Sequence, residues 1–276
     1  MTRWGILAMS LAMGCAPALS TFTPAAVTPG PVRFRGALAM GASVPVGQVS
    51  DLIDTAETLS TRLNANEMLS DADRQRLYNS IAGLVVSPPG ASPEMHVRMG
   101  LGHRADIGFR TTFSDYRLDG RYQLLESAHA PFDLSVGLGL SMTRVAFPLG
   151  DALEPAVSAD GFSAYAVEVP VLAGWSGRFG AFWFGPKLLL RSFSSAIQVR
   201  TTGDTYEAMS LDGRSVYGGG QIGGMLGFRW VFLAFELSVM GMSSTGSVQV
   251  GNGAYRAGLD FGGLVIAPTV GLVLQI

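Results

Sequence analysis

Apolar residues recur at every second position through most of this chain. The alternation is unbroken between positions 132 and 142, where small or polar residues separate Phe132, Leu134, Val136, Leu138, Leu140 and Met142. The segments 116–124 and 231–239 show the same pattern. A period of two is that of a β-strand, whose successive side chains point to opposite faces. The sequence therefore predicts an all-β fold whose strands have one apolar and one polar face.

The composition decides which of these faces meets the surroundings. Only 14% of the residues are charged, against about 25% in a typical soluble domain, and the mean hydropathy is +0.32. After the first few residues there is no run of about 20 apolar residues, so a closed β-barrel is the remaining structure that can cross a bilayer. We therefore expect the apolar face to meet lipid and the polar face to line a lumen.

Residues 31–276 are predicted to form an antiparallel transmembrane barrel of about ten strands, within a range of about 8 to 12. Longer polar segments at 147–160, 194–213 and 245–257 are expected to be extracellular loops, because such barrels combine short periplasmic turns with longer outer loops. Strand prolines lack an N–H for the ladder, so we expect bulges or strand ends at Pro170, Pro186 and Pro268.

The first residues have the pattern of a secretory signal. A positive start at Arg3 is followed by the apolar run 4–13, which is too short to cross a bilayer. The segment before Cys15 resembles a bacterial lipoprotein signal, which implies a signal peptide over 1–14, a lipid on Cys15 and delivery to the outer membrane. Residues 15–30 are then expected to form a flexible tether. The alternative is an ordinary signal that is cut after Ala18, in Ala16-Pro17-Ala18, and discards Cys15.

A helical insert is predicted between the first and second strands, over 47–91. Leu52, Ala56, Leu59 and Leu63 repeat at helical spacing, as do Leu77, Ile81 and Leu84. Ser70 is a suitable N-cap for the second helix, and Pro88-Pro89-Gly90 ends the insert. Strand parity places it on the extracellular side. It is either a loop packed over the barrel mouth, a lid that binds a partner, or a plug reaching into the lumen.

The last residues carry a specific resemblance. Thr269, Gly271, Leu274 and Ile276 match the C-terminal signal of outer-membrane barrel proteins, in which a polar residue precedes a glycine and two hydrophobic residues in alternate positions. The chain therefore resembles the bacterial outer-membrane β-barrel proteins of Gram-negative cells, a broad architecture. The resemblance implies contact with outer-membrane lipid and insertion by the barrel-assembly machinery, but it implies no activity.

Charged residues on the polar face are expected inside the lumen. They are Arg33, Arg35, Arg98, Asp106, Arg110, Arg117, Asp119, Arg121, Asp133, Glu168, Lys187, Arg191, Arg229 and Glu236. Nine are bases and five are acids. Side chains fill most of the interior of a barrel this small, so we expect an ionic network. The alternative is a narrow channel or binding barrel for a small anionic solute.

Little in the sequence points to catalysis. The three histidines are His96, His103 and His129, and no Gly-x-Ser-x-Gly motif accompanies them. His96 alone faces the lumen, where Ser92 or Ser192 is the candidate nucleophile of a lipid-modifying enzyme. The glycine clusters lack the Lys-Ser/Thr of a phosphate loop, a single cysteine permits no disulfide within the chain, and a net charge of -2 disfavours nucleic acid. We expect no cofactor and no metal, and a noncatalytic role in the envelope.

Overall fold

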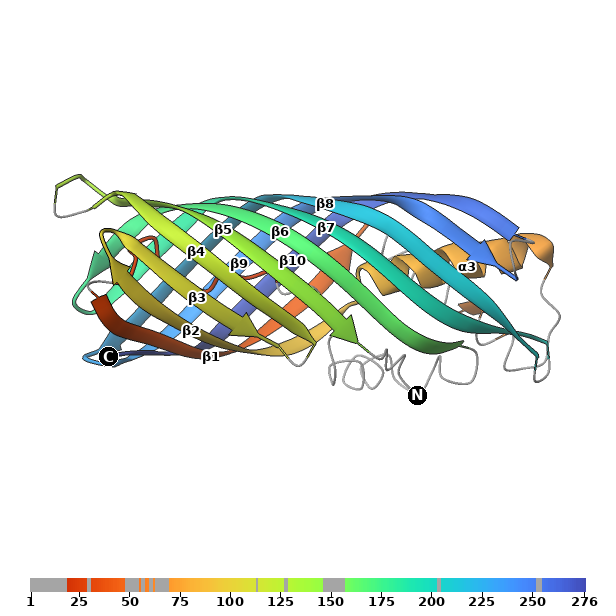
Figure 1. Cartoon of the computed structure of the whole chain (residues 1–276), viewed down its shortest axis with the longest axis horizontal. Helices are drawn as coiled ribbons and strands as arrows, with labels where there is room; N and C mark the ends of the chain where they lie inside the picture. Colours follow the sequence, from red (N-terminus) through yellow and green to blue (C-terminus); the bar gives the residue numbers. More distant parts are fainter. Residues whose placement is uncertain are drawn as a thin grey trace.

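The computed structural model describes residues 19–28, 31–47, 55, 58–59, 62, 70–112, 114–126, 129–145, 157–202, 205–251 and 255–276. The described chain forms one closed barrel, seen from the side in Figure 1. Its strands are β1 (Pro31–Val46), β2 (Gly90–Gly102), β3 (Ala105–Thr111), β4 (Asp115–Leu125), β5 (Asp133–Val145), β6 (Val157–Gly177), β7 (Gly180–Thr202), β8 (Thr205–Phe228), β9 (Val231–Val250) and β10 (Tyr255–Gln275).

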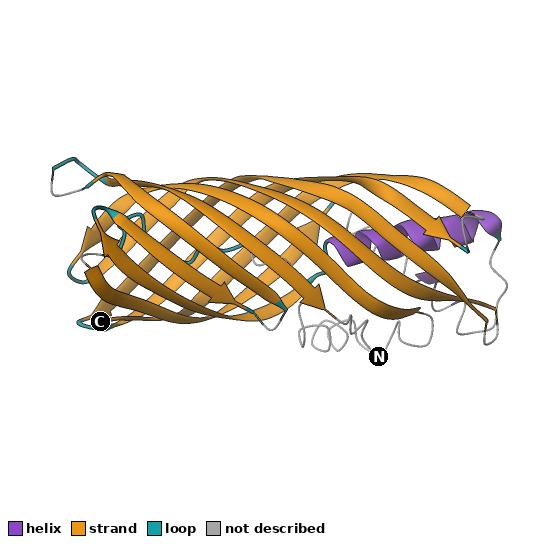
Figure 2. Cartoon of the chain, viewed as in Figure 1, coloured by secondary structure: helices purple, strands orange, loops and turns teal. Residues whose placement is uncertain are grey.

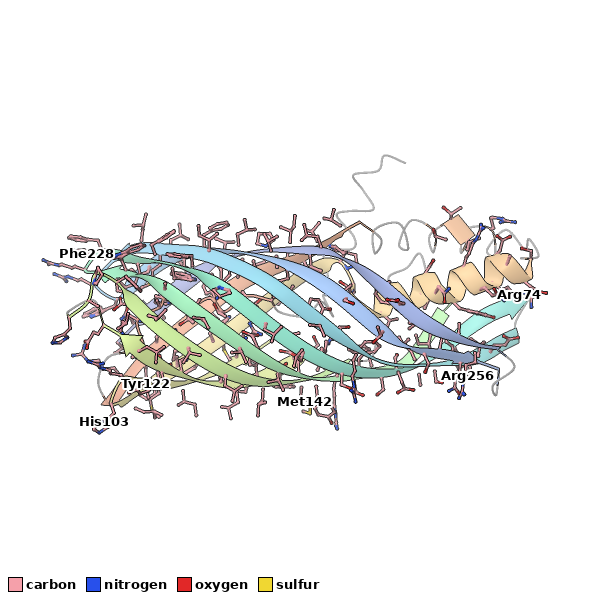
Figure 3. The ribbon with its side chains drawn as sticks, turned by 90° about the horizontal axis from the view of Figure 1, so that it is seen from above. Arg74, His103, Tyr122, Met142, Phe228 and Arg256 are labelled. Carbon is pink, nitrogen blue, oxygen red and sulfur yellow. The ribbon has the colours of Figure 1, made fainter. Side chains whose placement is uncertain are left out.

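Every strand pairs antiparallel with its neighbours in the sequence, and β1 pairs with β10 to close the barrel. The predicted fold class is confirmed. Tight turns, including the one that follows Gly102, join strands at one end, near the C-terminus. His103 and Phe228 lie at this end, whereas Arg74 and Arg256 lie at the other (Figure 3).

The strands differ greatly in length, which gives the barrel one low and one high side. The strands β2, β3 and β4 have 13, 7 and 11 residues, whereas β7 and β8 have 23 and 24. About 9 to 11 tilted residues suffice to cross a bilayer. The strands β6–β10 are therefore long enough to continue well beyond it. The prediction that 194–213 and 245–257 are loops was wrong in large part. The strands β7, β8 and β9 run through most of these positions.

The polarity of the two faces reverses along these long strands. On the outer face of β7, Leu188 and Leu190 are followed by Ser192 and Ser194, all exposed. On the inner face the order is opposite, since buried Lys187 precedes buried apolar residues such as Phe193 and Ile197. The alternation therefore continues through the predicted loops with its faces exchanged. The parts of β6–β10 that rise above the short strands, here called the upper wall, carry polar residues on their outer face. These residues gave 194–213 and 245–257 the composition of loops.

An apolar belt covers the outer face nearer the tight turns. Its members are exposed and lie on all ten strands; they include Leu38, Met95, Ile107, Leu118, Leu138, Val169, Leu190, Ile222, Leu233 and Leu272. Leu138 is 55% exposed and Leu233 61%. Such a continuous apolar surface does not face water in a soluble protein. The prediction that the apolar face points outward is confirmed for this part of the barrel.

The three strand prolines lie beside interruptions of the ladder. The β6–β7 pairing runs to Pro170↔Lys187 and resumes at Ala173↔Phe184, which leaves a gap that contains Pro186. The β1–β10 pairing has a gap between Gly41↔Thr269 and Val44↔Ile266, where Pro268 lies. Pro lacks the N–H that a ladder bond requires. The register is the same on both sides of each gap. The gaps are therefore positions where pairing is missing, and the predicted bulges or strand ends are not found there.

One helix of the predicted insert is described, α3 (Asp71–Val86). Ser70 is its N-cap, as predicted, and the Ser70 hydroxyl accepts a hydrogen bond from the Asp73 N–H at 3.2 Å. The apolar residues Leu77, Ile81 and Val85 are buried in one cluster with inward-facing residues of β7–β10. The helix therefore covers the apolar inner face of the upper wall, at the end far from the tight turns (Figure 2).

No helix in the described ranges is both long and apolar enough to cross a membrane.

Candidate functional site: the filled lumen

Ten residues that precede β1 lie inside the barrel. Residues 19–28, here called the lumen segment, are buried except for Ala26. The segment starts beside Lys187 and Ser238 and reaches Asp106, close to the β2–β3 turn, at its other end. The prediction of a flexible tether over 15–30 is therefore wrong for this part, and Cys15 lies outside the described residues. The composition of the segment gave no signal of burial, because its binding partners belong to distant strands.

Charged lumen residues bind the backbone of this segment. Three bases donate to its carbonyl oxygens: Lys187 to Leu19, Arg110 to Ser20 and, at 2.6 Å, Arg121 to Pro24. Such bonds satisfy peptide groups that no strand ladder pairs.

Acidic and amide side chains accept bonds from the N–H groups of the segment. Glu236 accepts from the N–H groups of Thr21 at 2.7 Å and Phe22 at 2.8 Å. Asp106 accepts from the Thr28 N–H at 2.9 Å, and Gln123 accepts from Val27 at 3.2 Å. The lumen charges therefore hold a piece of the chain's own backbone.

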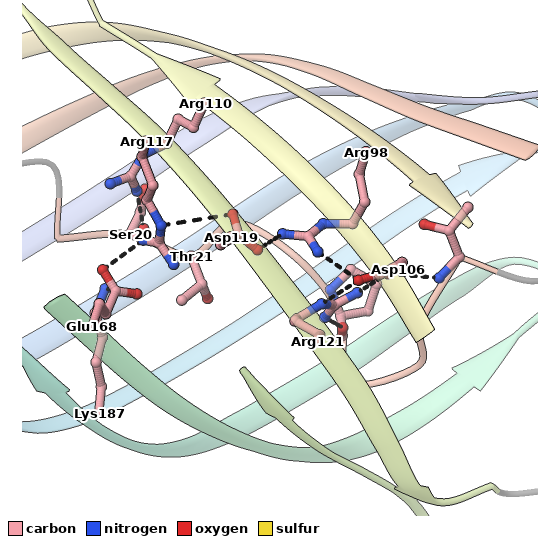
Figure 4. A network of polar contacts seen from close by, with 12 residues as sticks. Ser20, Thr21, Arg98, Asp106, Arg110, Arg117, Asp119, Arg121, Glu168 and Lys187 are labelled. Carbon is pink, nitrogen blue, oxygen red and sulfur yellow. Dashed lines mark hydrogen bonds and ion pairs between the residues drawn. The ribbon is translucent and has the colours of Figure 1, made fainter. Parts of the chain in front are cut away.

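The same charged groups pair with one another in a continuous chain of ion pairs (Figure 4). Asp106 bridges Arg121 and Arg98, each at 2.6 Å. Asp119 pairs with Arg98 and, at 3.7 Å, with Arg117. Glu168 then pairs with Arg117 at 2.5 Å and with Lys187 at 3.1 Å. Four bases and three acids, contributed by β2, β3, β4, β6 and β7, are thus joined on the inner face of the barrel. Buried charges require such pairing, because each costs several kcal/mol to take from water.

Apolar side chains contact the lumen segment from another part of the wall. Phe22 and Ala25 belong to a buried cluster that also contains Ala37, Ala39, Leu172, Trp183, Met225, Phe232, Ala234 and Val273. The Trp183 indole donates to Glu236 at 2.9 Å, so this cluster also touches the polar network. The segment is consequently held by burial of apolar surface as well as by hydrogen bonds. A cavity beside Thr21, Arg35 and His96 measures about 20 Å³, room for about one water molecule.

The structure places twelve of the fourteen predicted lumen charges inside and two outside. Arg33 is exposed, and Arg229 lies in the β8–β9 turn with its guanidinium over the Phe228 ring. The prediction was wrong for these two. Arg33 lies in β1 where the β1–β2 register shifts between Pro31 and Phe34, which breaks the alternation, and Arg229 lies past the end of β8. Two buried acids were missed, Glu94 and Asp115. Alternation on β2 and β4 carried the signal for both.

With these changes the buried charges of the described residues are equal in number. The described buried bases are Arg35, Arg98, Arg110, Arg117, Arg121, Lys187 and Arg191, and the buried acids are Glu94, Asp106, Asp115, Asp119, Asp133, Glu168 and Glu236. Seven bases therefore face seven acids. The excess of positive charge that the sequence suggested is absent from the described interior.

Among the described residues, no serine is hydrogen-bonded to a histidine. His96 Nε2 lies 2.9 Å from Glu94 Oε2, and the Ser20 hydroxyl donates to the same oxygen at 2.8 Å. Of the candidate nucleophiles, Ser192 faces outward and Ser92 is buried on β2, and no hydrogen bond links either to His96 in the described ranges. His103 lies exposed in a turn, and His129 is exposed beside Glu126. No cluster of potential metal ligands is found among the described residues.

The C-terminal motif lies at the seam that closes the barrel. Thr269 faces inward and is buried, whereas Leu274 and Ile276 are exposed on the outer face. Gly271 pairs with Ala39 of β1, and a Cβ built on Gly271 would collide with the Leu38 carbonyl oxygen. The glycine of the motif therefore has a local role, since a side chain there would separate β1 from β10.

Comparison with known proteins yields structural neighbours alone. No protein-family model matches the chain, and no curated protein matches it. One solved structure of similar shape is the outer membrane protease OmpT from Escherichia coli, at 9% identity and a TM-score of 0.45, with 89% of this chain and 97% of that chain covered.

Two further neighbours have lower scores. A major outer membrane protein from Thermus thermophilus has 10% identity and a TM-score of 0.38, with 88% of this chain and 99% of that chain covered. The monoaromatic hydrocarbon channel CymD has 10% identity and a TM-score of 0.29, with 97% and 96% covered. At these identities no residue or activity is carried over. The closed antiparallel barrel of ten strands with an apolar outer belt is the architecture of bacterial outer-membrane β-barrel proteins.

Proposed function

We propose that this protein is an integral barrel of the bacterial outer membrane with a closed lumen and a noncatalytic role in the cell envelope. The observation that carries the proposal is the occupied lumen. The lumen segment and the chain of ion pairs fill the space that water and solutes would need. The C-terminal motif supports assembly by the barrel-insertion machinery as part of the same proposal.

The apolar belt supports the membrane location. Exposed leucines, valines and aromatic residues surround the barrel on every strand. Tyr122, Trp175 and Trp230 are exposed near the ends with the tight turns, where aromatic side chains favour the interface between lipid and water. The polar outer face of the upper wall then lies outside the bilayer. This assignment gives the high wall and α3 an extracellular position.

Charge balance and hydrogen bonding both argue against the anionic-solute channel. A basic-lined path requires unpaired positive charge, but Arg98, Arg117 and Arg121 are each paired with carboxylates. The guanidinium of Arg121 is further engaged by the Pro24 carbonyl. A passing anion would have to displace these partners. The energetic cost favours a structural role for the network.

The geometry at His96 supports the noncatalytic assignment. In a hydrolase the histidine takes the proton of the nucleophile, and a carboxylate orients the histidine from its other nitrogen. Here His96 and Ser20 both bind Oε2 of Glu94. The carboxylate lies between them, so the histidine is not placed to act as a base toward this hydroxyl.

Conductance in planar bilayers tests the closed lumen. We expect purified wild-type protein to give no stable channels, whereas a variant lacking residues 19–28 should open steps of defined conductance. Heat-modifiable migration on gels verifies that the deletion variant is folded. If the deletion variant does not fold, the milder replacement of Leu19, Phe22 and Val27 by serine serves instead. Stable anion-selective channels from the wild type would overturn the proposal, as would a folded deletion variant that stays silent.

A further inference from the structure

One buried arginine stands outside the chain of ion pairs. Arg35 of β1 is 6% exposed, and no carboxylate of the described residues forms an ion pair with it. Its Nε and Nη1 atoms are buried and have no hydrogen-bond partner in the described part of the chain. A guanidinium in this state has lost its hydration without the compensation that an acidic partner gives. A negatively charged group is therefore expected near Arg35.

The register of the sheet explains why no acid lies beside this arginine. Arg35 pairs directly with Arg98 of β2 on one side and with Gln275 of β10 on the other. Like charges that lie directly opposite each other destabilise a sheet. Arg98 is compensated by Asp106 and Asp119, but Arg35 is not. The wall therefore leaves a positive charge at this place.

Equal numbers of buried acids and bases do not balance the charge at each place. Glu236 of β9 accepts hydrogen bonds from the N–H groups of Thr21, Phe22 and Trp183, all of which are uncharged. The carboxylate of Glu236 is thus occupied by donors other than Arg35. The described interior is matched in number, but a base and an acid each lack a charged partner.

The cavity beside Thr21, Arg35 and His96 lies where the charge is unmatched. The arginines and the acid in its lining are Arg35, Arg98, Arg110 and Asp119. Asp119 is already shared by Arg98 and Arg117. The Thr23 hydroxyl also belongs to the lining residues, is buried, and has no hydrogen-bond partner among the described residues. The lining therefore combines an excess of positive charge with donors that lack acceptors.

We propose that this cavity holds one halide ion, bound by the guanidinium of Arg35 and the hydroxyl of Thr23 after small rotations of both side chains toward it. A water molecule would satisfy the donors but would leave the charge of Arg35 uncompensated, whereas a halide does both. The volume of about 20 Å³ admits one particle of about the size of water. It excludes phosphate, sulfate and organic anions. The ion is held rather than conducted, so the proposal goes beyond the closed lumen and does not require a path through it.

The ion would also complete the attachment of the lumen segment. The residues before and after Thr23 are bound through their backbones to Glu236 and Arg121. The Thr23 hydroxyl itself finds no acceptor on the described wall. A halide between Thr23 and Arg35 connects the segment to β1, the strand that follows it in the chain.

Anomalous diffraction from crystals grown in sodium bromide locates the ion directly. We expect a bromide peak in the cavity of the wild type, within hydrogen-bond distance of the Arg35 guanidinium. Arg35→Met should lose the peak. Arg33→Met, which changes an exposed arginine of the same strand, should keep it. A wild-type cavity that contains only water, or nothing, would overturn the proposal.

A measurement in solution separates a specific site from binding at crystal concentration only. The protein is unfolded with urea in detergent at constant ionic strength, while chloride is replaced stepwise by gluconate, which is too large for the cavity. For one bound ion, each tenfold rise in chloride above the dissociation constant should lower the equilibrium constant for unfolding about tenfold. Arg33→Met should show the same dependence. Arg35→Met should lose it, and Thr23→Val should require a higher chloride concentration.

The remaining outcomes also decide the question. A bromide peak without chloride-dependent stability would show binding at crystal concentration only and would overturn the proposal. Equal chloride dependence in Arg35→Met and Arg33→Met would do the same, because it indicates a general effect of salt. If Arg35→Met does not fold, the wild-type bromide map and the chloride dependence of Thr23→Val provide the test.

Discussion

The guanidinium of Arg121 donates a hydrogen bond at 2.6 Å to the carbonyl oxygen of Pro24, a residue 97 positions earlier in the chain. Through this bond a barrel-wall side chain holds a strand-free segment in the lumen. Arg121 is also paired with Asp106 at 2.6 Å. The ionic network and the lumen segment are thus one unit, and a change in either is expected to disturb the other.

Removal of one central acid should show this coupling. Asp106→Asn leaves Arg98 and Arg121 without their shared carboxylate and weakens the bond to the Thr28 N–H. Breaking a buried ion pair on one side costs about 3–5 kcal/mol, and we expect a loss of this size in the free energy of unfolding. Denaturant titration in detergent, followed by tryptophan fluorescence, measures it. Asp71→Asn, at the exposed start of α3, is the control and should change stability little. If Asp106→Asn left the free energy of unfolding unchanged, the network would not stabilise the barrel.

Placement of the bilayer can be tested by one charge at two heights. Leu138 lies 55% exposed in the apolar belt, whereas Ser210 lies exposed on the outer face of the upper wall. Leu138→Arg should reduce stability in lipid vesicles by about 2–4 kcal/mol, the cost of a base facing mid-bilayer lipid. Ser210→Arg should fold as well as the wild type. Equal tolerance of both changes would contradict the assigned belt.

The helix α3 should be separable from the barrel wall. Ile81 is 1% exposed among apolar wall residues, so Ile81→Asp places an unpaired charge in that cluster. We expect α3 to leave the wall and become a substrate for added protease, while the ten-strand ladder persists and the protein remains heat-modifiable. Gln75→Asp changes an exposed residue of the same helix and should stay resistant. Loss of the whole barrel in Ile81→Asp would show that α3 is an integral part of the fold.

The C-terminal glycine should matter even without the assembly machinery. A Cβ at Gly271 would collide with the Leu38 carbonyl oxygen, so Gly271→Ala should hinder closure of β1 on β10. We expect a reduced yield of refolded barrel in detergent, at a cost of about 1–3 kcal/mol. Gly218→Ala is the matched control, because a Cβ there meets nothing within 4 Å. Normal refolding of Gly271→Ala, with a defect only in cells, would assign the glycine to recognition alone.

The strands and the start of α3 could be predicted from the sequence, because residues a few positions apart determine them. The alternation around Leu138 predicted a strand with its apolar face outward, and Ser70 predicted the start of α3. The ten strands and the helix between the first two are confirmed. Each of these depends on residues a few positions apart, whose periodicity and capping chemistry act within the element itself.

Features that depend on distant partners escaped prediction. Residues 19–28 have no periodicity, and their burial depends on wall residues such as Asp106, Arg121 and Glu236. The upper wall was missed for another reason. Ser194 and Asp212 face outward there, and the apolar inner residues pack on α3. The alternation of the strand continues, but the polar residues are on the outer face and the apolar residues on the inner face.

The exchange of polarity between the faces also works as a depth marker. Leu140, Val167, Leu190 and Val216 are aligned by consecutive rungs across β5–β8. Four positions along the strands, another set of rungs aligns Arg144, Ser163, Ser194 and Asp212. If the barrel moved toward the periplasm, the second, polar set would enter lipid. If it moved outward, the first, apolar set would be exposed to water. On these strands the order of the exposed side chains thus marks where the apolar outer surface ends and the polar one begins.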